Sequence, residues 1–298
     1  MAAVFNVAVG IATAGRREQL TLTLKQLAQQ RRLPEKLFVC PAAPPDFDSS
    51  VVEELPFPVE VVSGARGLCA QRNAILRACT GADLLFLFDD DFYPARDYIE
   101  RALELFAAEP SIVIATHHPE LDGASSSGVS HEEALRALSR FDQTAVSEPS
   151  TSETYAGYGC NMVVRLAPVR AHQLWFDENL PLYSWLEDVD FSRRLSPHGR
   201  IVVYTALRGV HLGTKRGRTS GVRLGYSQIA NPVYMLKKGS LSHRVALGQI
   251  ARNVAKNTLR AFWPEPWVDR AGRVRGNAIA VAHLVTGQLH PLNAAKLP

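Results

Sequence analysis

The sequence of 298 residues predicts an α/β fold in which a mostly parallel sheet carries helices on both faces, followed by a basic helical C-terminal extension. Three observations lead to this prediction. Apolar runs of strand length alternate with segments of helical periodicity through residues 1–116. The run at 84–88 is apolar throughout, as in a strand buried on both faces. Positive charge and helix-compatible sequence dominate the last third of the chain.

In the first half, strands and helices alternate in order. Strands are expected at 5–11, 36–40, 59–62, 84–88 and 112–116, and helices at 17–30, 68–79 and 99–108. The first helix carries Leu20, Leu24 and Leu27 on one face, and Pro110 ends the third. Ligands of such sheets bind beyond the carboxyl ends of the strands, so the loops at 13–16, 41–48, 65–67 and 89–91 are expected to converge on one crevice.

The second half is less regular. Helices are expected at 131–141, 188–196 and 242–262, strands at 162–166 and 201–207, and a polar loop at 142–154. The helix at 188–196 is expected to end at the sequence Pro-His-Gly that follows it.

The composition is that of a globular protein, with 46% hydrophobic and 21% charged residues. No stretch reaches the roughly 18 apolar residues that a membrane-spanning helix needs. The N-terminal residues lack the basic start and cleavage site of a signal peptide. The four cysteines lie far apart without C-x-x-C spacing, which predicts buried, reduced thiols, a cytoplasmic location and no zinc site.

The net charge of +4 conceals an asymmetry. Residues 215–298 carry a net charge of +12, whereas residues 1–214 carry −8. The basic third predicts an anionic partner, and we consider a membrane surface that apolar side chains of the same region would enter. These side chains are Val245, Leu247, Ile250, Val254, Phe262, Trp263 and Trp267. The alternative is a pair of helices packed on the core with a solvated basic face.

Three carboxylates, Asp89 to Asp91, follow directly after the buried strand at 84–88. They must lie where the strand emerges from the sheet, and carboxylates this close repel each other unless a cation joins them. The D-x-D pair Asp89 and Asp91 is therefore a candidate holder of a divalent ion on a nucleotide diphosphate. The alternative is a solvated acidic turn.

Two further clusters are candidate anion sites at the starts of helices, where backbone amides attract negative charge. One follows the first strand and the other opens the helix at 68–79. The residues are Thr13, Ala14, Arg16, Arg66, Arg72 and Asn73. The alternatives are a helix cap with a solvated arginine and an ordinary polar helix face.

A fourth cluster, Trp185 with Glu187 and Asp188, opens the helix at 188–196. The helix dipole alone would favour acids there. A carboxylate beside an aromatic wall that stacks on a sugar would instead serve as a general base toward a hydroxyl. Downstream, His211 follows the strand at 201–207 and is either a structural histidine or a metal ligand.

Six segments in this order resemble the inverting sugar-nucleotide glycosyltransferases of family 2, which have the GT-A fold. They are VAVGIATAGR, RGLCAQRNAIL, LLFLFDDDFYP, GYGCNMVV, FDENLPLYSWLEDVDFSRRL and GVHLG, and the resemblance covers roughly residues 4–225. It implies that Asp89, Asp91 and His211 bind Mn²⁺ or Mg²⁺ and that Asp188 is the catalytic base. It further implies donor binding by the two anion clusters with Asp90, Lys215, Arg216 and Arg218, and acceptor binding by Gly159, Asn161, Trp185 and Glu187.

The implied organisation is a glycosyltransferase domain at 1–225, with a nucleotide-sugar half at 1–116 and an acceptor half at 117–225, followed by the extension at 226–298. The implied activity is metal-dependent hexosyl transfer from a nucleoside-diphosphate sugar to a glycan or lipid-linked saccharide in polysaccharide biosynthesis. UDP is the default nucleotide, and a peripheral position on the inner face of the membrane is expected, without a nucleic-acid partner. One departure concerns the second strand, which ends in Cys40 and Pro41 where the family usually has acids that hold the base and ribose.

Two rival functions stay open. A sugar-nucleotide nucleotidyltransferase shares the strand–helix plan and an acidic metal site. It usually has a loop such as G-x-G-T-R, which the segment ATAGRR matches only weakly. A non-enzymatic nucleic-acid or anion binder would use the basic tail, although that tail has few aromatic residues and no recognised nucleic-acid motif.

Overall fold

The structure is a computed structural model that describes residues 5–144, 146, 148–217 and 219–298. The chain divides into two units, each with a hydrophobic core of its own. The first unit holds residues 1–66, 71–175 and 195–217, and the second holds 67–70, 176–194 and 218–298.

An eight-stranded mixed sheet in the order β3-β2-β1-β4-β9-β6-β10-β8 forms the centre of the first unit. Its strands are β1 (Val7–Thr13), β2 (Lys36–Pro41), β3 (Val59–Val61), β4 (Leu84–Asp89), β6 (Ile112–Thr116), β8 (Thr151–Glu153), β9 (Asn161–Arg165) and β10 (Arg200–Tyr204). The first four in the order run parallel, while β9 lies antiparallel between β4 and β6. The predicted fold class is confirmed.

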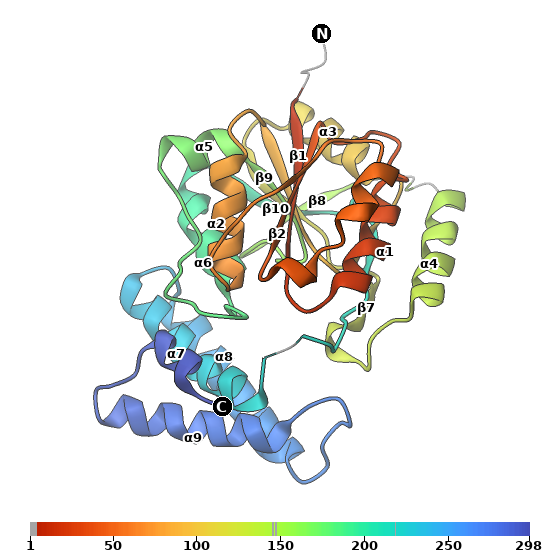
Figure 1. Cartoon of the computed structure of the whole chain (residues 1–298). Helices are drawn as coiled ribbons and strands as arrows, with labels where there is room; N and C mark the ends of the chain where they lie inside the picture. Colours follow the sequence, from red (N-terminus) through yellow and green to blue (C-terminus); the bar gives the residue numbers. More distant parts are fainter. Residues whose placement is uncertain (1–4, 145, 147, 218) are drawn as a thin grey trace. The chain divides into compact units, whose positions relative to one another are not determined.

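Helices cover the sheet as its strand order requires. They are α1 (Arg17–Leu27), α2 (Leu68–Ala78), α3 (Tyr98–Ala108) and α5 (Leu166–Ala171). A further helix of this unit, α4 (His131–Gln143), packs instead on Tyr93 and Val210. From β1 the chain crosses to β2 on one side and later returns to β4 on the other, so right-handed crossovers place α1 and α2 on opposite faces. Figure 1 shows this arrangement. Gly10 in β1 lets α2 approach, because an added Cβ would lie 2.7 Å from the side chain of Ile75.

A second, three-stranded sheet in the order β5-β11-β7 was not predicted. Its strands are β5 (Phe92–Pro94), β7 (Leu121–Asp122) and β11 (Gly209–His211). Two or three residues are too few to show an alternating pattern in the sequence. The sheet joins segments more than 80 residues apart, and its position directly after the acidic tripeptide makes it part of the candidate site.

The second unit is helical, with α6 (Glu187–Leu195) followed by α7 (Gly221–Lys238), α8 (His243–Arg260) and α9 (Arg270–Val285). Glycines let α7 and α9 pack closely. An added Cβ at Gly225 would lie 2.1 Å from the carbonyl oxygen of Arg273, and one at Gly276 would lie 2.1 Å from that of Val222. None of the described helices combines the length and apolarity needed to cross a bilayer.

The segment at 142–154 differs from its predicted structure, whereas the cysteines agree with theirs. The predicted polar loop at 142–154 contains β8, an edge strand that pairs antiparallel with β10, so that part of the prediction was wrong; residues 145 and 147 lie outside the described residues. Its residues Thr-Ser-Glu gave no apolar signal because an edge strand is solvated. The cysteines are buried and free, as predicted, and burial raises the pKa of the Cys40 and Cys79 thiols to about 11.

Candidate functional site

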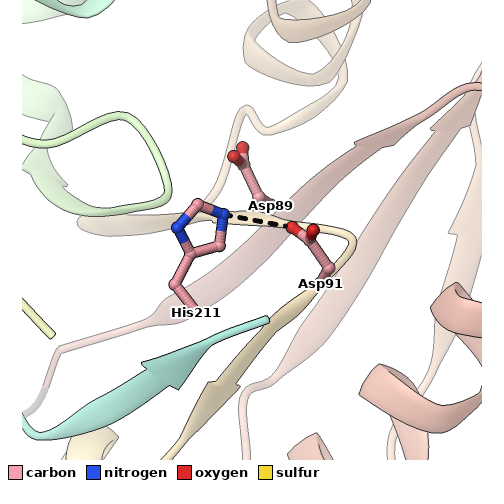
Figure 2. Close-up of side chains that lie close together, drawn as sticks. All are labelled: Asp89, Asp91 and His211. Carbon is pink, nitrogen blue, oxygen red and sulfur yellow. Dashed lines mark ion pairs between the residues drawn. The ribbon is translucent and has the colours of Figure 1, made fainter. Parts of the chain in front are cut away.

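The acidic tripeptide and His211 meet in the first unit. Asp89 is the last residue of β4, and Asp91 directly precedes β5. Because β11 pairs antiparallel with β5 and sets His211 opposite Phe92, the imidazole comes to the acids. One ligand atom each from Asp89, Asp91 and His211 lies within 4.8 Å of the other two. Figure 2 shows the histidine ring directed at Asp91, with Asp89 beside them.

The residues present fit a divalent cation. Nε2 of His211 lies 3.3 Å from Oδ1 of Asp91, yet among the described residues no group forms a well-aligned hydrogen bond with that buried oxygen. The other oxygen, Oδ2, accepts a hydrogen bond from the amide of Thr214 at 2.7 Å. A buried carboxylate oxygen without a donor is unfavourable, and a cation would satisfy it. Two carboxylates and one imidazole suit Mn²⁺ or Mg²⁺.

Asp122 orients the histidine, and the sequence gave no sign of it. Nδ1 of His211 lies 2.9 Å from Oδ1 of Asp122, whose Oδ2 accepts a hydrogen bond from the hydroxyl of Tyr158 at 2.8 Å. The pairing of β11 with β7 places Asp122 beside His211. A carboxylate on the outer nitrogen fixes the ring and leaves Nε2 directed at Asp91 (Figure 2). Asp122 stands in no motif, so only the strand pairing reveals its role. Tyr158 lies in the segment GYGCNMVV, but the sequence does not show its contact with Asp122.

The charges of this group are coupled. Burial lowers the pKa of His211, but the interactions with the carboxylates of Asp122 and Asp91 outweigh burial and raise that pKa to about 10. Burial raises the pKa of Asp91, but interaction with His211 and the charge of Arg16 outweigh it and hold the pKa below its usual range. Burial raises the pKa of Asp89, and the positive charge of Arg72 only partly offsets this increase. A cation at this position would compete with the proton on Nε2 of His211.

We expect Asp122→Asn to weaken Mn²⁺ binding by about 10–100-fold, because the amide no longer provides the negative charge that makes the imidazole a better ligand. Isothermal titration calorimetry with Mn²⁺ measures the affinity. Tyr158→Phe is the graded comparison, since it removes one hydrogen bond to the same carboxylate and keeps the charge. Equal affinity of Asp122→Asn and the unchanged protein would show that Asp122 does not support the metal ligand.

Asp90 faces away from this group and anchors a loop. Its carboxylate accepts hydrogen bonds from Oγ1 of Thr13 at 2.7 Å and from Nη1 of Arg16 at 2.8 Å. Burial raises the pKa of Asp90 to about 7 against the opposing charge of Arg16. The same guanidinium donates to the carbonyl oxygens of Thr214 and Arg216 at 3.1 and 2.8 Å. Arg16 thereby ties the start of α1 to the loop that follows β11.

A pocket of about 450 Å³ lies beside this anchor. Its lining consists of Gly15, Arg16, Arg17, Glu18, Gln19, Leu22, Pro45, Asp46, Thr214 and Arg216. Asp46 holds one wall, because its carboxylate accepts hydrogen bonds from the amides of Gly15 at 2.9 Å and Ala43 at 3.1 Å. The loops after β1, β2 and β4 thus converge as predicted, whereas the loop at 65–67 spans the boundary between the units. The volume is within the usual range for small-molecule sites.

The second anion cluster contributes a buried support. Nη2 of Arg72 donates to the carbonyl oxygen of Gly159 at 2.7 Å and lies 3.2 Å from Oδ1 of Asp89. Arg72 therefore fixes both the first acid of the pair and the turn before β9. Asn73 is buried next to it in sequence, whereas Arg66 is exposed.

The side chains of Asn161 and Lys215 both donate hydrogen bonds to backbone carbonyl oxygens. The amide of Asn161 accepts from Oγ1 of Thr116 and donates to the carbonyl oxygen of His117, which fixes the end of β6. Nζ of Lys215 donates to the carbonyl oxygen of Gly123 at 2.7 Å. Ala14 is partly buried, Arg216 is exposed, and Arg218 lies outside the described residues.

In the second unit, the segment before α6 is strained. Leu182, Ser184 and Leu186 have φ angles of 60°, 54° and 73°, in the left-handed region that residues with a Cβ seldom adopt. Asn231 holds the segment through a hydrogen bond of 2.7 Å from Nδ2 to the carbonyl oxygen of Trp185. Such strain persists only where surrounding contacts enforce it, and it is concentrated at functional sites.

This segment presents two acids on the first turn of α6. Glu187 is buried, and Asp188 is partly buried with Oδ1 accepting from the amide of Val189 at 2.8 Å. Trp185, just before them, is also partly buried. The sequence thus located the acids correctly at a helix start, but it gave no sign of the strained backbone that precedes them.

Asp190, two residues further on, has a structural role. It is fully buried and accepts hydrogen bonds from Nζ of Lys238 at 2.9 Å and from Oγ of Ser240 at 2.5 Å. Nε of Arg194 donates to it at 2.9 Å. These contacts attach α6 to the end of α7. The third acid of the segment Glu-Asp-Val-Asp is therefore explained by the fold of the second unit.

Solved structures similar to this chain share its fold. A mannosyltransferase from Pyrobaculum calidifontis, in complex with GDP-Man and Mn²⁺, is 17% identical with a TM-score of 0.56, and the match covers 99% of this chain and 86% of that one. TarS from S. aureus (residues 1–349), in complex with UDP-GlcNAc, is 18% identical with a TM-score of 0.54, covering 97% and 79%. GalNAc-T7 with UDP, GalNAc and Mn²⁺ is 10% identical with a TM-score of 0.55, covering 96% and 58%.

At these identities the structural likeness shows the fold, and it confirms the predicted GT-A type. A search of curated proteins finds no match to the sequence. The family model that matches is the one described as glycosyl transferase family 2, and it matches residues 8–167, which include β1, the acidic tripeptide and β9. Since the match extends over more than half of the sequence, the chain belongs to glycosyl transferase family 2.

Proposed function

We propose that this glycosyltransferase moves a sugar from a nucleoside-diphosphate sugar to an acceptor hydroxyl by metal-assisted direct displacement with inversion. The observation that carries the proposal is the group of Asp89, Asp91 and His211, in which buried Asp91 has a carboxylate oxygen that lacks a hydrogen bond among the described residues. In the same unit, the anchor formed by Arg16 links these acids to a pocket of suitable size. Both features are expected of a diphosphate site next to a nucleoside site.

Asp89, Asp91 and His211 would hold Mn²⁺ or Mg²⁺. The cation, when bound, offsets the negative charge that develops on the leaving diphosphate. The lining of the pocket supports binding of the nucleotide, because it offers three guanidinium groups and the carboxylate of Asp46. The donor-binding set that we propose is Thr13, Ala14, Arg16, Arg66, Arg72, Asn73, Asp89, Asp90, Lys215, Arg216 and Arg218. Several of these side chains hold the loops together, so part of the set would act by positioning.

Asp188 is the proposed base. Its carboxylate would take the proton of the acceptor hydroxyl as the oxygen attacks the anomeric carbon from the face opposite the diphosphate. A single displacement inverts the anomeric configuration. The strained segment at 182–186 supports this role, because strain of this kind is concentrated at functional sites. Gly159, Asn161, Trp185 and Glu187 are the proposed acceptor-side residues.

The proposed acceptor is a hydroxyl of a glycan or a lipid-linked saccharide, in polysaccharide biosynthesis. UDP stays the default nucleotide, although the similar solved structures hold GDP-Man in one case and UDP-GlcNAc in another. Asp46 offers the carboxylate for the base or ribose that the end of β2 lacks. We also propose the functional division into a donor half at 1–116, an acceptor half at 117–225 and an extension at 226–298.

A donor screen tests the function. Purified full-length protein is incubated with a panel of UDP-, GDP- and TDP-sugars and with Mn²⁺, Mg²⁺ or EDTA, and the released nucleotide is identified by mass. We expect one donor to be hydrolysed slowly to nucleoside diphosphate and free sugar in the presence of a metal ion, and not in EDTA. Pyrophosphate release from a nucleoside triphosphate and a sugar 1-phosphate would establish the nucleotidyltransferase alternative instead. Once an acceptor is found, the proton spectrum of the product's anomeric centre decides between inversion and retention.

A further inference from the structure

Helix α8 of the second unit presents an apolar row to solvent. Leu247, Ala251, Ala255 and Leu259 are all exposed and follow each other at intervals of four residues, so they lie along one side of the helix. The leucine side chains are 62% and 68% exposed. With exposed leucines at both ends, the four-residue row makes an apolar stripe of just over three helical turns. The core of the unit does not use this stripe.

A row of cations runs beside this stripe. Arg244, Arg252, Lys256 and Arg260 are exposed and share the same spacing of four residues, with Gly248 at the remaining position. Like charges at this spacing destabilise a helix. Within the described parts of the chain, the one carboxylate within 4.0 Å of this row is that of Glu265, which reaches Arg260 at that limit and lies closer to Arg270, at 2.9 Å. The row therefore keeps its charge available for an anionic partner.

Aromatic side chains extend the stripe just past the end of α8. Phe262 and Trp263 are 73% and 78% exposed, with ring centroids 6.0 Å apart, and Trp267 follows on the same connection to α9. Exposed Phe and Trp next to one another are unfavourable in water, because transfer of their apolar surface to an apolar phase is favourable. Tryptophan is enriched where a polar phase meets the hydrocarbon of a bilayer.

The opposite side of α8 is already engaged. Ala246 lies in a buried cluster with Leu186, Met235 and Leu241, while Ile250 and Val254 pack against the core formed by α7 and α9. Asn257 donates from Nδ2 to Oε1 of Gln228 at 2.7 Å. The expectation that Val245, Ile250 and Val254 enter an interface is thus wrong, because these side chains face the core of the unit. On α8, the outward stripe and the cationic row remain exposed to a partner.

We infer that this outward face of α8, together with Phe262 and Trp263, binds an anionic lipid surface. A helix whose exposed side combines a narrow apolar stripe with a row of cations lies in the plane of a membrane interface. Charge and apolar surface both find a partner there. A second copy of the chain, meeting this face through a two-fold axis, would bring the cationic row against itself. A nucleic-acid duplex would bind the cations but offers no apolar phase for Leu247 and Leu259.

The inference extends the proposed function, since a lipid-linked acceptor would be presented at such a surface, but its test needs no activity. Full-length protein is floated with vesicles of equimolar phosphatidylglycerol and phosphatidylcholine, and with vesicles of phosphatidylcholine alone. We expect flotation with the anionic vesicles, much less with the neutral ones, and weakening by added salt.

Two variants and a matched control test the surface itself. The double substitution R252E/K256E is expected to weaken binding to the anionic vesicles by about 30-fold or more, because each cation contributes about 1 kcal/mol near such a surface. R136E/R140E on α4 has the same spacing and the same change of net charge at exposed positions of the first unit, and it should bind like the unchanged protein. F262S/W263S should weaken binding at least about tenfold and leave its dependence on salt.

Circular dichroism melting identifies any variant that has lost its fold. R252E/K256E and F262S/W263S change exposed side chains at separate positions, so one variant remains informative if the other unfolds. Equal flotation of R252E/K256E and R136E/R140E would overturn the inference. The absence of flotation with anionic vesicles would also overturn it. This holds if the protein instead binds a DNA duplex, and equally if it forms a dimer that R252E/K256E abolishes.

Discussion

Asp188→Asn is expected to lower turnover by about 10²–10⁴-fold while the affinity for the donor stays near that of the unchanged protein. The range is the usual contribution of a general base, which asparagine cannot replace because its amide does not accept a proton at neutral pH. The donor found in the screen is titrated calorimetrically in the presence of metal ion, and turnover is measured with saturating acceptor. Near-normal turnover of this variant would remove Asp188 from the role of base.

Neighbouring acids provide the controls. Glu187→Gln changes the adjacent carboxyl on the same turn of α6, and a much smaller effect on turnover is expected if proton transfer belongs to Asp188 alone. Asp190→Asn should behave differently from both. Its carboxylate is fully buried among Lys238, Ser240 and Arg194, so neutralising it should lower the melting temperature before any effect on turnover is considered. An effect of Asp188→Asn that followed melting temperature in the same way would indicate a structural role for Asp188.

Asp91→Asn is expected to weaken Mn²⁺ binding by more than about 100-fold and to abolish metal-dependent donor binding. Loss of a residue that only supports a metal ligand already weakens metal binding by about 10–100-fold. The substitution of Asp91 removes the negative charge of a proposed ligand itself, so its effect should be larger. The asparagine also leaves the protonated His211 facing an uncharged amide in place of a carboxylate 3.3 Å away. Mn²⁺ titration followed by donor titration, each by calorimetry, separates the two effects.

Asp83→Asn is the matched control, because Asp83 directly precedes the opposite end of the same strand, β4, where its carboxylate accepts from the amide of Asn6 at 2.8 Å. Its Mn²⁺ affinity should equal that of the unchanged protein. If Asp91→Asn titrated with Mn²⁺ as the unchanged protein does, then the buried group of acids and histidine would not be the metal site, whatever donor the enzyme uses.

The metal-site prediction divides into a local and a non-local part. Asp89 and Asp91 could be placed from the sequence, because an apolar strand and the turn after it are adjacent in the chain. His211 was a candidate ligand from its place after a strand, with a structural role as the alternative, and the family resemblance implied the metal role. The pairing of β11 with β5 explains its approach to Asp91. Asp122 had no signal at all, since two-residue β7 shows no pattern and its pairing with β11 is a tertiary event. Strand periodicity encodes which face is buried and not which strand is the partner.

The donor side illustrates the same limit. Arg16 was selected as a group that meets the donor, and the structure shows its guanidinium joined to Asp90 and to two carbonyl oxygens of the loop after β11. A sequence shows that an arginine follows a strand, but it does not show which acceptors 200 residues away will occupy its nitrogens. The pocket beside it is lined by the loops after β1, β2 and β11. The sequence predicted only that loops after strands would converge on one crevice.

The sequence by itself determined the α/β alternation, the position of the acidic tripeptide at the end of β4, the helix start at Glu187 and Asp188, and the positive charge of the C-terminal third. All of these depend on neighbours along the chain, through burial periodicity and helix-terminal preferences. The tertiary structure alone decided the three-stranded sheet, the support of His211 by Asp122 and the course of α7. Gly221, Gly225 and Pro232 make α7 a poor helix by propensity, and it forms because glycine at 225 and 276 lets α7 and α9 pack at close range.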